Sequence, residues 1–192
     1  MVVFNYQYIV DIKKMKSYLF SVDVESDGPC PGLYSMVNFG ACVVTDNPQN
    51  YTFYGETAPI SDSFIPEALN VSGKTREQHL NFQSPEKTMR EFADWINKIC
   101  DNGRARATLI SDNPAFDWQF INYYFHKFLG DNPFGFSARR IGDIYSGLGQ
   151  NFYIANKWKS LRKTTHDHNP VNDAIGNAEA LLYFRDRLGL KL

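Results

Sequence analysis

The sequence predicts an α/β protein built on one mixed sheet. Before residue 60, three runs rich in apolar and β-branched residues are separated by connections rich in Gly, Pro and Asn, which is typical of an antiparallel meander. After residue 84 the apolar residues recur at helical spacing, and these stretches alternate with short apolar runs. Antiparallel strands followed by alternating helices and strands indicate a mixed sheet with helices packed against it.

Composition limits the classes of protein to be considered. The chain has 192 residues, 43% apolar and 15% aromatic, which is enough for one domain with a sizeable core. The formal net charge of −1 means that nucleic-acid binding would depend on a local basic surface. Three cysteines at irregular spacing indicate a reducing compartment. No apolar run approaches the roughly 20 residues of a membrane-spanning helix, so we expect a cytoplasmic protein with no membrane partner.

Residues 1–15 precede the predicted domain. Apolar and polar residues alternate between Val2 and Val10, which is compatible with an additional edge strand. The other interpretation is an N-terminal extension or a cloning remnant. We expect residues 16–192 to form a single domain.

The first strand is expected over residues 17–25, SYLFSVDVE, an apolar run that ends in two carboxylates. Side chains of a strand alternate between faces, so Asp23 and Glu25 point the same way with their Cα atoms roughly 7 Å apart. Both carboxylates can then reach one divalent cation, or a pair of cations, at the end of the strand. For this motif alone, the simpler interpretation is an edge strand with two solvated acids.

The other expected elements follow the same two periodicities. Further strands are predicted over residues 35–45, 51–57, 108–111 and 139–144. Helices are predicted over residues 66–69, 85–100, 115–129 and 170–188. Ser84 and Asn169 are the expected N-caps of two of them, because each precedes a proline at the first helical position.

Two more acids lie at predicted helix starts. Asp117 follows the sequence NPAF, and Asp173 follows NPVN, five residues after His168. A carboxylate near a helix N-terminus is stabilised by the helix dipole, which is a sufficient explanation for either acid alone. Together with the two strand acids, however, they match the carboxylate oxygens that a site for two hard divalent cations requires.

The order of these motifs resembles the DEDDh group of 3′-5′ exonucleases. The pattern is D-x-E on the first strand, N-x-x-F-D at the start of a middle helix and H-x-x-x-x-D at the start of the last helix, and the resemblance covers residues 16–190. It implies a ribonuclease H-like fold with a five-stranded mixed sheet whose first three strands are antiparallel. It also implies a two-metal exonuclease that uses Mg²⁺ or Mn²⁺ to release nucleoside 5′-monophosphates from single-stranded DNA or RNA, or from short oligonucleotides.

The resemblance also implies a role for each motif residue. Asp23, Glu25 and Asp173 match the ligands of the first metal, and Asp23 also bridges to the second. Asp117 matches the remaining acid, which supports the second metal through water. His168 matches the general base, a role that suits a side chain whose pKa lies near neutrality.

The other three histidines, His79, His126 and His166, are expected at the surface or in the core without a catalytic role. A lone histidine is more often structural than catalytic, and only His168 has the family spacing to the last aspartate. His166 is its nearest rival.

Four residues are candidates for substrate contact: Ser26, Asn113, Phe116 and Lys163. Ser26 begins a loop that is longer and richer in Pro and Gly than the family usually has, and we expect its length to tune substrate choice. Asp112 replaces the family's usual histidine before Asn113, either as an outer acid or as a turn residue. Phe116 could stack on a base or belong to the core.

A basic stretch precedes the last motif and contains Lys157, Lys159, Arg162 and Lys163, with Phe152, Tyr153 and Trp158 interleaved. Phosphate attraction and base stacking would let this stretch hold a single strand of nucleic acid. The alternative is that these basic residues are solvated charges of a loop and bind nothing. The main functional alternative is a catalytically silent nucleic-acid-binding or scaffold module on the same fold. DNA or RNA preference is not specified, and a homodimer is compatible with the sequence.

Overall fold

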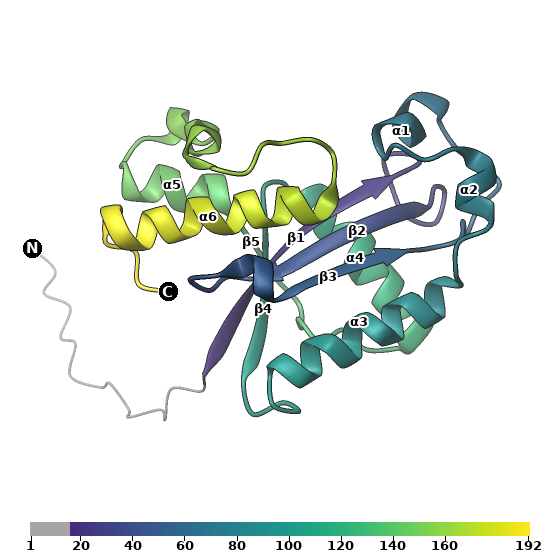
Figure 1. Ribbon diagram of the computed structural model, residues 1–192, viewed down its shortest axis with the longest axis horizontal. Helices are drawn as coiled ribbons and strands as arrows, with labels where there is room; N and C mark the ends of the chain where they lie inside the picture. Colours follow the sequence, from purple (N-terminus) through teal and green to yellow (C-terminus); the bar gives the residue numbers. More distant parts are fainter. Residues whose placement is uncertain (1–15) are drawn as a thin grey trace, which may run out of the picture.

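The computed structural model describes residues 16–192, so the expectations for residues 1–15 lie outside the described part of the chain. A five-stranded sheet with the order β3-β2-β1-β4-β5 forms the centre (Figure 1). The strands are β1 (Ser17–Ser26), β2 (Met36–Val43), β3 (Thr52–Glu56), β4 (Arg106–Ser111) and β5 (Ala138–Arg140). The first three pair antiparallel, whereas β4 runs parallel to β1 and β5 parallel to β4, which confirms the predicted mixed sheet.

Helices cover both faces of this sheet. They are α1 (Pro66–Val71), α2 (Arg76–Leu80), α3 (Pro85–Ile99), α4 (Pro114–Leu129), α5 (Ile141–Leu148) and α6 (Pro170–Leu188). Three short 3-10 helices, η1 (Pro48–Asn50), η2 (Phe152–Ile154) and η3 (Lys157–Leu161), complete the described elements. In Figure 1, α5 and α6 lie on one side of the sheet and α3 on the other. The predicted caps are present, because the side chains of Ser84 and Asn169 accept hydrogen bonds from the backbone of α3 and α6.

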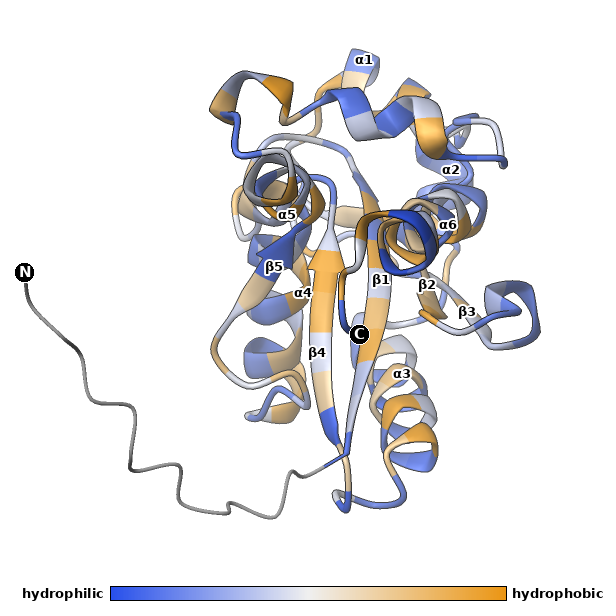
Figure 2. Cartoon of the chain, turned by 90° about the vertical axis from the view of Figure 1, so that its left-hand side faces the viewer, coloured by the Kyte–Doolittle hydropathy of each residue, from blue (hydrophilic) through white to orange (hydrophobic). Residues whose placement is uncertain are grey.

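The alternation of β1 assigns its side chains to two different layers. Phe20, Val22 and Val24 are buried in the core against α3 and α4, whereas the face with Asp23 and Glu25 is turned toward α6. A second core cluster between α5, η3 and α6 contains Trp158 and Phe184. Figure 2 shows the apolar middle of β1 and β4 enclosed between these layers. The acidic end of β1 thus emerges from a well-packed strand.

The predicted fifth strand over residues 139–144 is wrong in its second half. Only three residues, Ala138–Arg140, pair with β4, and α5 begins at Ile141. Ile141, Ile144 and Tyr145 follow helical spacing and pack into the second core cluster, so the tertiary contacts favour a helix there. The short helix α2 was also missed, although Thr75 and Gln78 form a capping box that the sequence carries.

Gly40 of β2 determines how closely α6 approaches the sheet. It pairs with Asp23 of β1, and paired residues of antiparallel strands present their side chains to the same face. A Cβ atom at Gly40 would lie 2.3 Å from the carbonyl carbon of Pro170 and from the nitrogen of Val171. Because glycine has no Cβ atom, the first turn of α6 can rest directly on β2 beside Asp23.

Within residues 16–192, no helix has the length and apolar character needed to cross a membrane.

Candidate active site

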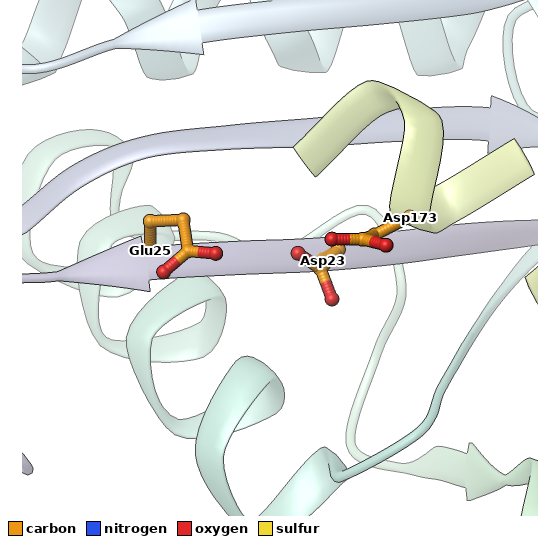
Figure 3. Close-up of side chains that lie close together, drawn as sticks. All are labelled: Asp23, Glu25 and Asp173. Carbon is orange, nitrogen blue, oxygen red and sulfur yellow. The ribbon is translucent and has the colours of Figure 1, made fainter. Parts of the chain in front are cut away.

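Three acids from β1 and α6 converge at one point of the sheet. Asp23 and Glu25 lie on β1, and Asp173 lies in the first turn of α6, which extends across the strand (Figure 3). One carboxylate oxygen from each residue lies within 4.8 Å of the others. Oxygens on opposite sides of a Mg²⁺ or Ca²⁺ ion are about 4–5 Å apart, so this donor set fits a hard divalent cation. Among residues 16–192, Asp173 Oδ2 is buried without a hydrogen-bond partner, which leaves that oxygen available as a ligand.

Asp117, the fourth predicted acid, lies beside this group and contacts the backbone of β1. It lies in the first turn of α4 and is 4% exposed. Its Oδ1 accepts a hydrogen bond of 3.1 Å from the backbone nitrogen of Val24, the residue between Asp23 and Glu25. The pairing of β1 with β4 ends at Ser21, so Asp117 takes a strand donor that β4 does not reach. The structure therefore places Asp117 against the site, but outside the group of three acids that share the tightest spacing.

Burial, together with repulsion from neighbouring carboxylates, raises the pKa values of Asp23, Glu25 and Asp117. Burial is the main cause for Glu25, with Asp173 and Asp117 adding to it, and its pKa rises from 4.5 to about 7. Burial raises the pKa of Asp117 to about 7 as well, although the hydrogen bond from Val24 opposes the shift. The pKa of Asp23 is raised well above its ordinary value by burial and then by Asp117 and Asp173. Such a cluster favours either protons or a divalent cation.

Two histidines reach the acids from residues 162–169, which we call the histidine loop. His168 Nδ1 lies 3.6 Å from Glu25 Oε1, and the backbone of His168 has a φ of +59°. His166 Nδ1 lies 2.6 Å from Asp173 Oδ1, and the two imidazole rings are 4.5 Å apart. The sequence assigned His166 no role, yet the structure brings it into contact with the acid cluster. His79 is buried and His126 is exposed, as expected.

Arg162 also contacts the acid cluster, which the sequence did not predict. Its Nη1 lies 3.6 Å from Asp173 Oδ1, and only 9% of its side chain is exposed. The guanidinium lies 4.9 Å above the ring of Trp158, which is fully buried, and donates a hydrogen bond to Asn177. Arg162 and Trp158 are therefore not part of an open strand-binding surface. No sequence signal identified the inward orientation of Arg162.

The four predicted substrate contacts lie in different surroundings. Ser26 is buried, and its hydroxyl donates to the carbonyl of Gly28 at 2.7 Å. Asn113 is exposed at the start of α4. Phe116 lines an apolar hollow of about 380 Å³ that also reaches Glu25 and Ser26. Lys163 lines a second hollow of about 310 Å³.

The second hollow has a mixed polar lining. It includes Asp23, Lys159, Arg162 and His166 besides Lys163. Asp112 also lines it, and its Oδ2 lies 2.5 Å from Lys159 Nζ. The sequence left two interpretations of Asp112 open, an outer acid and a turn residue. The structure adds a third, an ion pair with Lys159 of the basic stretch. Each hollow adjoins one acid of β1, the apolar hollow Glu25 and the second hollow Asp23.

The loop that follows β1 is held by a buried carboxylate that the sequence analysis missed. Asp27 is fully buried, and its Oδ1 accepts a hydrogen bond of 2.5 Å from the backbone nitrogen of Ser35. Its Oδ2 accepts one of 3.0 Å from Arg76 Nη1, while its carbonyl accepts one from Ile65 just before α1. Asp27 thereby ties the loop to α1 and α2, and α1 forms one wall of the apolar hollow.

The acids at the end of the central strand, the aspartates at two helix starts and the adjacent histidines define a metal-dependent nuclease on this fold. No protein-family model matches the chain. A curated protein does match the chain. The 3′-5′ DNA exonuclease Cap18 of Escherichia coli is 38% identical to it over 182 residues, which cover 92% of this chain and 95% of the relative.

Solved structures share this fold. The nuclease domain of 3′hExo, a DEDDh family member solved with rAMP, superposes with a TM-score of 0.71 at 15% identity, covering 93% of this chain and 96% of that one. E. coli Exonuclease I in complex with a dT13 oligonucleotide gives a TM-score of 0.68 at 13% identity, covering 91% of this chain and 42% of that one. These likenesses establish the ribonuclease H-like fold. The chain belongs to the DEDDh family of 3′-5′ exonucleases and is a metal-dependent hydrolase.

Proposed function

We propose that this exonuclease removes nucleoside 5′-monophosphates from the 3′ end of single-stranded nucleic acid with two divalent cations. The convergence of Asp23, Glu25 and Asp173 within 4.8 Å carries the proposal, because such a group needs a cation to offset its charge. DNA is the first substrate to consider, since the E. coli relative is named a DNA exonuclease. RNA is the alternative.

Each acid has a distinct part in this proposal. Asp23, Glu25 and Asp173 would hold the first cation, Mg²⁺ or Mn²⁺, and Asp23 would share the second with Asp117. When bound, two such cations stabilise the attacking and leaving oxygens of an in-line displacement. Asp117 has an additional task, because its hydrogen bond to the backbone of Val24 fixes the strand segment between the two β1 ligands.

His168 is the proposed general base. Its side chain is 52% exposed and its Nδ1 lies 3.6 Å from Glu25, so the ring borders the acids and is also open to an incoming water molecule. His166 differs, because its Nδ1 is already engaged with Asp173 at 2.6 Å. We assign His166 to orienting Asp173 and His168 to accepting the proton.

The two hollows suggest how the strand end is held. The apolar hollow beside Glu25, with Phe116 in its wall, suits the terminal base. The second hollow, with Lys159 and Lys163, suits phosphate oxygens. Asn113, which is exposed at the start of α4, would contact the terminal nucleotide, whereas Ser26 would shape the loop through its bond to Gly28.

The test is degradation of 5′-labelled single-stranded DNA and RNA with Mg²⁺ or Mn²⁺. We expect a ladder that shortens from the 3′ end, and its absence for both substrates would refute the proposal in favour of a silent binding module. Asp23→Asn should abolish the ladder. His168→Ala should lower kcat by about 10² to 10⁴-fold while leaving DNA binding intact. His166→Ala is the matched control, and a larger loss for His166→Ala than for His168→Ala would exchange the two assignments.

A further inference from the structure

The histidine loop has no regular secondary structure, although it presents both histidines to the acids. Residues 162–169 connect η3 to α6 and form neither helix nor strand. Most of their side chains are exposed, so few apolar contacts hold them. A general base acts only within hydrogen-bond reach of the proton that it takes. Something must therefore fix this loop relative to Asp173 and Glu25.

Glu179 on α6 makes the most concentrated contact with the loop. Its Oε2 accepts hydrogen bonds of 2.8 Å from the backbone nitrogens of Lys163 and Thr164. Its Oε1 accepts a third, of 3.0 Å, from the hydroxyl of Thr164. An ionised carboxylate that receives several donors binds more strongly and with more defined geometry than a single neutral acceptor. One side chain thus fixes two consecutive loop residues.

The neighbouring residues of α6 fit the same arrangement. Gly176 lies beneath the loop, where a Cβ atom would be 3.1 Å from Arg162 Cδ and 3.2 Å from the carbonyl oxygen of Thr164. Asn177, one position further, accepts the hydrogen bond from Arg162. The first part of the loop therefore packs against one stretch of α6, which consists of residues 176, 177 and 179.

The other end of the loop is fixed separately. Asp167 accepts hydrogen bonds from the backbone of Asn169 at 3.0 Å and from the side chain of Asn172 at 2.8 Å. His166 and His168 lie between this end and the residues that Glu179 binds. The positive φ of His168 leaves its backbone in a region that few residues adopt without support from both sides.

We propose that Glu179 is a positioning residue for catalysis, which holds the histidine loop so that His168 and His166 face the acid cluster. This inference rests on the proposed function of His168. Glu179 has no place in the three-acid group and lines neither hollow beside it. Its effect must therefore pass through the loop, and the loss of Glu179 must lower turnover without removing a metal ligand.

The test compares Glu179→Ala and Glu179→Gln with Glu86→Ala, which removes an exposed acid of α3 whose one ion pair within residues 16–192 is with Arg90. For Glu179→Ala we expect kcat on single-stranded DNA to fall about 10- to 100-fold, KM to change less than about twofold, and Mn²⁺ affinity by calorimetry to stay unchanged. Amide hydrogen exchange at Lys163 and Thr164 should accelerate. Glu179→Gln keeps one acceptor oxygen and should show a smaller loss, and it replaces the alanine variant if that variant does not fold.

Two results would overturn the inference. One is a kcat within about twofold of wild type together with faster exchange, since the loop would then be released without consequence. The other is a loss of Mn²⁺ affinity that matches the loss of activity, which would place Glu179 in the support of the metal ligands instead. If the wild-type protein degrades neither DNA nor RNA, the proposed function fails, but hydrogen exchange still reports whether Glu179 fixes the loop.

Discussion

Substitution of Gly40 by alanine tests whether the close approach of α6 to the sheet sets the position of Asp173. The new Cβ atom would lie 2.3 Å from the backbone of Pro170 and Val171, whereas carbon atoms in contact are about 3.5–4.0 Å apart. Backbone atoms cannot rotate away as a side chain would, so the first turn of α6 must move outward by about 1 Å or more. Asp173 lies in that turn and would move with it.

Two consequences of different size follow from this shift. Overpacking of a filled interior costs about 1–3 kcal/mol, which is the expected loss in free energy of unfolding for Gly40→Ala. A displacement of about 1 Å in a catalytic constellation costs about 10²-fold in rate, which is the expected loss of exonuclease activity. Urea denaturation, calorimetric titration with Mn²⁺ and a single-stranded DNA degradation assay measure the three quantities. Metal binding should weaken because one ligand of three has moved.

Gly147 provides the matched control. It lies in α5, and its φ is not in the positive region. Apart from its chain neighbours and the backbone of its own helix, no atom of residues 16–192 lies within 4 Å of the position that its Cβ would occupy. Gly147→Ala should leave activity unchanged and stabilise the protein by up to about 1 kcal/mol, because alanine is the better helix residue. The reasoning about α6 would be refuted if Gly40→Ala lost stability while keeping wild-type activity and Mn²⁺ affinity.

Three further predictions concern charge. In EDTA, the free energy of unfolding should fall by at least about 3 kcal/mol as pH rises from 4.5 to 7, because Glu25, with its pKa raised to about 7, holds its proton in the folded state and releases it in the unfolded state. The raised pKa values of Asp117 and Asp23 act in the same direction. Mg²⁺ should remove this slope, and stability that rises over the same window would contradict the burial of the acid. Asp27→Ala should lower the free energy of unfolding by about 3 kcal/mol, because Arg76 loses its buried partner. The same substitution should raise KM more than it lowers kcat, because Asp27 holds the loop against α1, which lines the apolar hollow. An unchanged KM would show that Asp27 does not support this hollow. Lys159→Ala and Lys163→Ala should each lower the salt slope of single-strand binding by about 0.7, and slopes equal to wild type in filter binding would remove these lysines from the strand path.

The sequence predicted elements with a clear period and a cap. The helices that start at Pro85 and Pro170 were located because an N-cap, a proline and an apolar period coincide there. Strand alternation predicted that Asp23 and Glu25 share a face, whereas the resemblance to the DEDDh family implied that Asp173 joins them at one metal. The start of α5 was missed because Ile141 follows directly after a three-residue strand, and apolar runs of that length fit a strand as well as a helix.

Contacts that pass through irregular chain were not predictable. His166 and Arg162 reach Asp173 from the histidine loop, whose path depends on acceptors that lie further along α6. Neither the loop nor its acceptor Glu179 carries a periodic signal. The same holds for Asp27, which reads as one more polar residue of a Gly- and Pro-rich loop, although its carboxylate organises that loop from a buried position. Long-range side-chain contacts to loops require the three-dimensional structure.

The stacking of Arg162 on Trp158 makes the fluorescence of Trp158 sensitive to the position of the guanidinium. Trp158 packs in the cluster on the α6 side, whereas Trp95 and Trp118 pack against the core on the opposite face of the sheet. A guanidinium 4.9 Å from the indole affects its fluorescence, so any displacement of Arg162 by a cation or a phosphate changes the emission of a single residue. With Trp95 and Trp118 replaced by phenylalanine, the emission of Trp158 in unlabelled protein would report whether metal or substrate moves Arg162, in separate titrations and without a reaction taking place.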